Sequence, residues 1–157
     1  MKLFLFPFLV LIGFSLQGQI KLNKNLKYAA PLQVVAGFAD GTNQAYLFHY
    51  HNSGLFEKWN IKPNGQAWVN KWKIDPDGTV LVGQERFFGS STFLVFTTDF
   101  HHATRFVENR FNEGTGLVYA IGHGAKRKRI IDYLADFSIL FVSRSIGFHA
   151  SYSIIFK

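Results

Sequence analysis

The C-terminal stretch 129–157 constrains the fold more than any other part of the chain. It holds three apolar runs, 130–133, 138–143 and 152–156, which are rich in Ile, Val, Phe and Tyr and are joined by short polar or glycine-containing segments. Such runs are typical of strands in hairpins and are too short for ordinary helices. A last strand needs partners on both sides or remains an open edge, and a closed barrel removes that edge. The stretch therefore predicts a barrel.

Similar runs continue upstream and are separated by turn residues. The clearest hairpin turn is Asp75-Pro76-Asp77-Gly78, between an alternating run and a short apolar one. The pattern predicts an all-β fold, an antiparallel meander of about eight to ten strands that closes into a β-barrel. The further predicted strands are 31–38, 44–51, 67–74, 79–82, 92–98, 103–111 and 117–121.

Composition favours one folded domain without covalent staples. The chain has 157 residues, of which 48% are hydrophobic and 17% charged, and this balance excludes a disordered chain. Its 18 phenylalanines suit both strands and apolar cavities. The absence of cysteine excludes a disulfide, a thiolate metal site and a thiol nucleophile.

Residues 1–18 have the pattern of a secretory signal peptide. Lys2 precedes the apolar run 3–16, and the small residue Gly18 offers a cleavage site. The run is shorter than the roughly 20 apolar residues that cross a bilayer. We therefore expect residues 19–157 to form a single secreted, extracellular domain. An uncleaved N-terminal anchor is the alternative.

Two segments resemble a known family. Residues 68–82 (WVNKWKIDPDGTVLV) look like the second and third strands of lipocalins, and residues 130–156 are similar to the closing strands of invertebrate lipocalins. The chain departs from that pattern in three ways. It lacks the Gly-x-Trp signature, since residues 44–47 (QAYL) occupy the place where the signature is expected, and it lacks the usual cysteines. Lys157 replaces the final Arg. The resemblance implies a divergent lipocalin, a calycin-like β-barrel.

This resemblance implies a secreted carrier that binds a small hydrophobic ligand, such as a fatty acid, retinoid, sterol or pigment, in the barrel cavity. Barrels of about eight strands hold either packed side chains or one small ligand, and such cavities are mostly apolar and aromatic. We expect the lining residues to come from different strands. The candidates are Trp72, Phe96, Phe106, Tyr119, Tyr133 and Phe141.

A shorter resemblance points to another class of function. Residues Gln33 to Gly37 spell QVVAG, the inhibitory hairpin motif of cystatins, although no long helix is predicted before them. An ordinary apolar strand is the simpler interpretation. The alternative function is therefore a secreted interaction or protease-inhibitor protein that acts through its surface.

The strongest charge feature is the basic run Lys126, Arg127, Lys128 and Arg129. Four adjacent cations could bind a polyanion, anionic lipid head groups or an acidic ligand. A solvated loop is the simpler interpretation. We expect no nucleic-acid partner for a secreted chain.

Residues with catalytic or metal-binding potential do not form a known motif. Asp99, His101 and His102 cluster, but no nucleophile motif of the Gly-x-Ser-x-Gly kind accompanies them. His49 and His51 would share one face of a strand, yet no third metal ligand can be assigned. The prediction is a protein that is not an enzyme and that has neither a metal site nor a cofactor.

Overall fold

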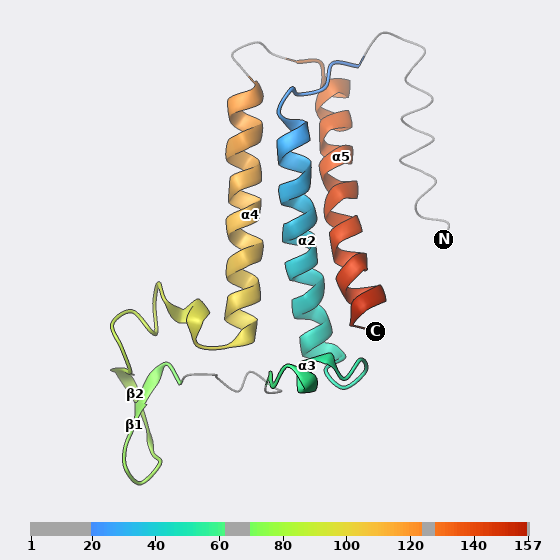
Figure 1. Cartoon of the computed structure of the whole chain (residues 1–157). Coiled ribbons are helices and arrows are strands. Elements are labelled where there is room, and N and C mark those ends of the chain that lie inside the picture. Colours follow the sequence, from blue (N-terminus) through green and yellow to red (C-terminus); the bar gives the residue numbers. More distant parts are fainter. Residues whose placement is uncertain (1–19, 62–69, 124–127, 157) are drawn as a thin grey trace.

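The computed structural model describes residues 20–61, 70–123 and 128–156. Three long helices dominate this part of the chain (Figure 1). They are α2 (Leu26–Phe48), α4 (Phe100–His123) and α5 (Ile130–His149). The smaller elements are α3 (Leu55–Lys58), β1 (Trp72–Ile74), β2 (Val80–Glu85), the 3-10 turn η1 (Val95–Thr97) and the π-helical turn η2 (Ala150–Ile155).

The predicted all-β barrel is wrong, and the resemblance to lipocalins is wrong with it. The structure is 64% helical, and the sheet among the described residues has two strands. The runs 103–111 and 117–121, predicted as strands, lie within α4. The run 31–38 lies within α2, as does most of the run 44–51.

The C-terminal runs 130–133 and 138–143 fail as strands because they belong to one continuous helix, α5. The residues between them, which predict a turn, include Leu134 and Ala135, and both are strong helix formers. Asp136 is a common turn residue, but here it is buried and accepts a hydrogen bond from the Asn23 amide at 3.0 Å. A distant partner therefore satisfies its carboxylate inside the helix.

The local hairpin prediction is confirmed. Strands β1 and β2 pair in antiparallel fashion, with Ile74 opposite Val80. The turn closes because the Asp75 carbonyl accepts from the Gly78 amide at 2.9 Å, and Gly78 has a φ of 90°. The Asp77 carboxylate accepts from the Thr79 amide at 2.8 Å.

The three long helices lie side by side, with α2 between α4 and α5 (Figure 1). Helices α2 and α5 run in the same direction and α4 runs in the opposite one. Small residues allow α2 and α5 to approach closely. A Cβ atom on Gly37 would overlap the Arg144 carbonyl, and one on Gly147 would overlap the Val34 carbonyl. The two backbones are therefore in direct contact.

Among the described residues, the cluster of large buried apolar side chains lies at one end of the bundle. Phe56, Ile61 and Phe156 pack there with Tyr46 of α2, and the rings of Phe56 and Phe156 stack with centroids 4.7 Å apart. Elsewhere the buried positions are mostly polar or small, and large apolar side chains lie outside. The helices within residues 20–61, 70–123 and 128–156 fall short of the combined length and apolar character needed to cross a membrane.

The cystatin-like hairpin at Gln33 to Gly37 is also absent, since these residues form the middle of α2. Ala36 and Gly37 are buried there against the neighbouring helices. A wedge that enters a protease cleft needs an exposed hairpin tip. This segment therefore does not have the geometry of the cystatin motif.

Candidate functional site

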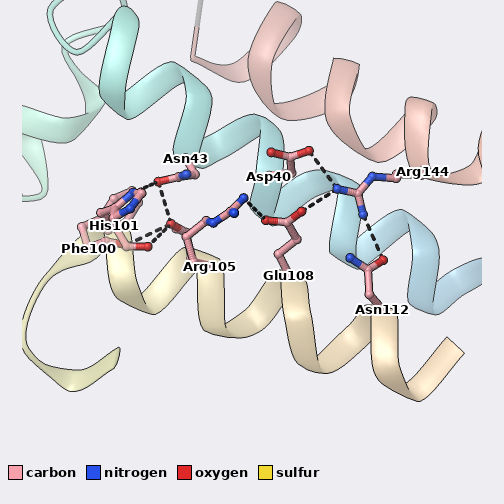
Figure 2. A network of polar contacts seen from close by, with 9 residues as sticks. Asp40, Asn43, Phe100, His101, Arg105, Glu108, Asn112 and Arg144 are labelled. Carbon is pink, nitrogen blue, oxygen red and sulfur yellow. Dashed lines mark hydrogen bonds and ion pairs between the residues drawn. The ribbon is translucent and has the colours of Figure 1, made fainter. Parts of the chain in front are cut away.

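A polar network joins all three long helices (Figure 2). Arg144 of α5 donates to Asp40 of α2 at 2.9 Å, to Glu108 of α4 at 2.6 Å and to Asn112 of α4 at 2.9 Å. The Gln33 side chain of α2 also donates to Asn112, at 3.0 Å. The side chains converge because each helix places a polar residue at the same level of the bundle.

The charges of this network are matched. The Glu108 carboxylate is buried and accepts from Arg144 with one oxygen and from Arg105 with the other, at 2.8 Å. Burial alone would lower the pKa of the Arg144 guanidinium, but its hydrogen bonds to Glu108 and Asp40 outweigh burial and raise that pKa. Each Glu108 oxygen is therefore bonded to a guanidinium group, one from α4 and one from α5. The role of this carboxylate is to fix the helices relative to one another.

The network continues toward the first turn of α4. The Asn43 side-chain oxygen lies 2.8 Å from Nδ1 of His101 and accepts from the Thr104 hydroxyl at 3.1 Å. Burial, with a smaller contribution from His102, lowers the pKa of His101. This imidazole is therefore neutral at pH 7 and tied to α2.

Of Asp99, His101 and His102, which lie close together in the sequence, the structure pairs Asp99 with His102, while His101 bonds Asn43. Nδ1 of His102 lies 2.6 Å from the Asp99 carboxylate, and Asp99 also accepts from the Thr98 hydroxyl at 3.3 Å. In the described part of the chain, no group of three or more His, Asp or Glu side chains could hold a metal ion. The carboxylate orients His102 at the start of α4.

An apolar groove lies beside this network. It has a volume of about 390 Å³ and separates α2 from α4 near the C-terminal turn. The hydroxyls of Thr42 and Thr104 donate to carbonyls of their own helices, at 2.8 and 3.0 Å, so they present methyl groups and no unsatisfied donor. The groove is lined by Phe38, Ala39, Thr42, Trp59, Phe100, Ala103, Thr104, Val107, Ile155 and Phe156.

The aromatic residues predicted to line a barrel cavity lie apart from this groove. The rings of Phe96 and Phe106 stack on each other, 4.1 Å apart, where η1 meets α4. Tyr119 and Tyr133 both contact His123 at the other end of α4. Two pairs are thus brought together, but at opposite ends of the helix.

The other two predicted lining residues lie on separate elements, away from the groove and from these two pairs. Trp72 is on strand β1 of the hairpin. Phe141 is on the outer face of α5, where 58% of it is exposed, and its nearest stacked ring is that of Phe137. None of the six predicted residues lines the groove, and their role in ligand binding stays a prediction.

The basic run is only partly described, because Lys126 and Arg127 lie outside the described residues. Lys128 forms an ion pair with Asp136 at 2.8 Å, and Arg129 forms one with Asp132 at 3.0 Å. The hydrogen bonds from Arg129, and next the amide of Lys21, lower the pKa of Asp132 to about 2.

The same end of the bundle holds a second buried carboxylate, Asp136. It accepts from the Tyr119 hydroxyl at 2.8 Å as well as from Lys128. Burial, together with this hydrogen bond to Asp136, raises the pKa of Tyr119 to about 12. Lys128 and Arg129 therefore help to hold the helix ends together instead of forming a simple solvated loop.

Sequence reasoning missed Asp40, Glu108 and Arg144 as a connected set. One signal was present in the C-terminal stretch, since Asp132, Asp136 and Arg144 are spaced by multiples of four within an otherwise apolar segment. That spacing places the charges on one side of a helix, but its even steps also place them on one face of a strand, so it does not decide between the two. Their partners on α2 and α4 carry no comparable signal.

No family model, no curated protein and no solved structure matches this chain. The lipocalin resemblance thus has no support from these comparisons, and the helical fold contradicts it. What the site can do follows from its geometry.

Proposed function

We propose that the chain binds a small hydrophobic molecule in the groove between α2, α4 and the C-terminal turn. The observation that carries this proposal is the lining, which is apolar or aromatic apart from two threonines, with no charged side chain among the described lining residues. A concave site of this composition is the usual form of a small-molecule site. The barrel cavity plays no part in it.

The volume and the apolar lining of the groove suit a small apolar group, such as part of the acyl chain of a fatty acid. The groove volume of about 390 Å³ is in the lower part of the range for small-molecule sites. Trp59 is 54% exposed at the rim, so a bound molecule would remain partly open to solvent. Burying roughly 250 Å² at about 25 cal/mol/Å² contributes on the order of 6 kcal/mol, and micromolar affinity remains after the costs of association.

Binding, not catalysis, suits the neighbouring polar groups. Glu108 is saturated by two guanidinium groups, and His101 is held by Asn43. Secretion of residues 19–157 and the absence of enzymatic activity stay predictions, as does the alternative of a surface-interaction protein.

Intrinsic fluorescence can test the groove directly. In the double variant Trp68→Phe/Trp72→Phe, Trp59 remains as the single tryptophan and reports on the rim of the groove. Titration with a fatty acid, a retinoid or a sterol should change its emission and saturate in the micromolar range. Absence of saturable binding by all three would overturn the proposal.

A matched pair of substitutions separates the groove from the rest of α4. Ala103→Phe fills the groove and should weaken binding at least tenfold. Ala120→Phe makes the same change at an exposed position of the same helix and should leave the affinity unchanged. Equal affinities of the two variants would place the ligand elsewhere.

A further inference from the structure

The outer face of α5 is a continuous apolar stripe. Ile130, Leu134, Phe137 and Phe141 are spaced by four, three and four residues, which places them on one face of the helix. Their exposed fractions are 79%, 54%, 64% and 58%. We call these four residues the α5 stripe. Faces of this kind on a stable protein mark a surface that contacts something else.

The inner side of α5 has the opposite character. Asp132, Asp136, Ser143 and Gly147 are buried where α5 packs. A helix that packs in water turns its apolar face inward. Here the charges are inside and paired, while the large apolar side chains are outside. This is the arrangement expected of a helix whose outer face meets hydrocarbon.

The way α5 packs on α2 agrees with this reversal. Direct backbone contact at Gly37, Gly41 and Gly147 replaces a layer of large apolar side chains between the helices. Small residues and polar contacts hold helices together where the surroundings are as apolar as the side chains. The buried carboxylates have partners, so no uncompensated charge opposes an apolar environment on the outside.

One end of the stripe carries positive charge. Lys21, Lys24 and Lys27 are exposed where the described chain enters α2, and Lys128 and Arg129 precede Ile130 at the same end (Figure 1). Lys128 and Arg129 are paired with Asp136 and Asp132, so the excess positive charge at this end comes from Lys21, Lys24 and Lys27. Clustered Lys and Arg beside an apolar surface attract anionic lipid head groups. We call this set of five cations the basic end.

The opposite edge of the layer is mixed. Helix α4 lies on the other side of α2 from α5 (Figure 1), and it exposes the ion pair of Arg110 with Glu113 as well as Leu117 and Ile121. The basic end beside the α5 stripe is therefore the feature that can orient the protein at a bilayer surface.

We propose that the α5 stripe contacts the acyl region of an anionic lipid bilayer, with the basic end at the head groups. The stripe is separate from the groove, since none of its four residues lines it. Loss of one surface is therefore distinguishable from loss of the other.

Vesicle flotation with the full chain tests the proposal. Vesicles of phosphatidylcholine with phosphatidylglycerol should bind the wild type more strongly than vesicles of phosphatidylcholine alone. Phe137→Glu/Phe141→Glu should reduce binding at least tenfold. Phe88→Glu places the same charge on an exposed phenylalanine outside the bundle and should have no effect. The apolar segment 3–16 is common to all variants, so it cannot produce the difference.

The basic end predicts a second difference. Lys24→Gln and Lys27→Gln should each weaken binding to the anionic vesicles about fivefold and leave binding to neutral vesicles unchanged. Added salt should reproduce this loss.

A spectroscopic test does not depend on the charged variants folding. A tryptophan introduced as Phe141→Trp, with the three natural tryptophans changed to phenylalanine, should be quenched by lipids brominated on their acyl chains. Phe88→Trp in the same background should not be quenched. Equal quenching of both tryptophans, or equal flotation of the Phe137/Phe141 variant and the wild type, would overturn the proposal. Concentration-dependent dimerisation that the stripe variant abolishes, without any vesicle binding, would overturn it in favour of a second copy.

Discussion

Arg144 connects helices that are far apart in the sequence. It lies on α5 and bonds Asp40 of α2 and Glu108 of α4, which are 104 and 36 residues away. Pairs of this kind cost desolvation energy when they form, and their removal is expensive when one partner stays buried. Arg144 therefore ties α2, α4 and α5 together through partners that would be left without their cation if it were removed.

Replacing Arg144 should lower the free energy of unfolding substantially, although arginine is usually found at protein surfaces. Arg144→Met keeps much of the side-chain volume but leaves Asp40 and part of Glu108 without their cation, and the free energy of unfolding should fall by about 3 kcal/mol. Arg110→Met is the control, because its ion pair with Glu113 is more than half exposed and contributes at most about 0.5 kcal/mol. Urea denaturation measures both. Similar losses in the two variants would mean that the network does not hold the helices together.

Asp132 should make the free energy of unfolding depend on pH in the acidic range. Its pKa of about 2 in the folded state lies below the ordinary value of 3.8, so the folded protein binds this proton less readily than the unfolded one. The stabilisation is fully present above about pH 4 and is lost as pH falls toward 2. Denaturation measured between pH 5 and 2 should show a smaller decline for Asp132→Asn than for the wild type. An unchanged decline would show that Asp132 is not paired.

At the scale of elements, the contact between α2 and α5 depends on glycine. Asp40-Gly41, which resembles a turn in the sequence, lies inside α2 because Gly41 faces the Phe148 carbonyl of the C-terminal helix. The buried residues of α5 are Asp132, Ala135, Asp136, Ser143 and Gly147, none of which is a large apolar side chain. Close backbone approach and the polar pairs hold the two helices together.

Two glycine-to-alanine substitutions should change the free energy of unfolding in opposite directions. Gly37→Ala places a Cβ atom against the Arg144 carbonyl, which forces the helices apart and should lower the free energy of unfolding by about 1–3 kcal/mol. Gly116→Ala on α4 meets no atom within 4 Å and should raise it by about 0.5–1 kcal/mol through helix propensity alone. Thermal unfolding followed by circular dichroism measures both. If Gly37→Ala were stabilising, the helices could not be in direct contact.

At the scale of the whole molecule, several charged side chains are buried and many large apolar side chains are exposed, the reverse of the usual arrangement in a protein in water. Buried Asp132, Asp136 and Glu108 stand where a protein in water usually places leucine or isoleucine, while Phe137 and Ile130 are exposed. Two separate apolar surfaces result from this arrangement, the groove and the α5 stripe. One can take a single apolar molecule, and the other meets an extended apolar phase.

The exposed apolar surface of the folded chain should affect the heat-capacity change of unfolding. Exposure of apolar surface raises that quantity and exposure of polar surface lowers it, with a usual net value of about 12–15 cal/mol/K per residue. Because much apolar surface is already exposed in the folded chain, we expect a value per residue below this range by scanning calorimetry. A value within the range, for a monomer, would mean that the apolar faces are buried after all.

Little of the candidate site could be predicted from the sequence. The pairing of Asp99 with His102 is local, and the proximity of these residues in the chain indicated it. The groove could not be found, because Trp59, Phe100 and Phe156 meet only when three separate segments pack. The periodicity of apolar residues normally identifies the buried face of a helix. It identifies the wrong face of α5, because the buried face carries Asp132 and Asp136.

By itself, the sequence determined the β-hairpin, since Asp75, Asp77 and Gly78 close that turn with hydrogen bonds to neighbouring residues. Short-range turn chemistry needs no tertiary partner. Only the tertiary structure decided that residues 130–149 form one helix and which of its faces points inward. Asp136 accepts from the Asn23 backbone amide and Arg144 pairs with Asp40, and both of these partners lie more than a hundred residues away. Without those partners a buried charge is prohibitively costly, and with them the helix can turn its apolar side outward.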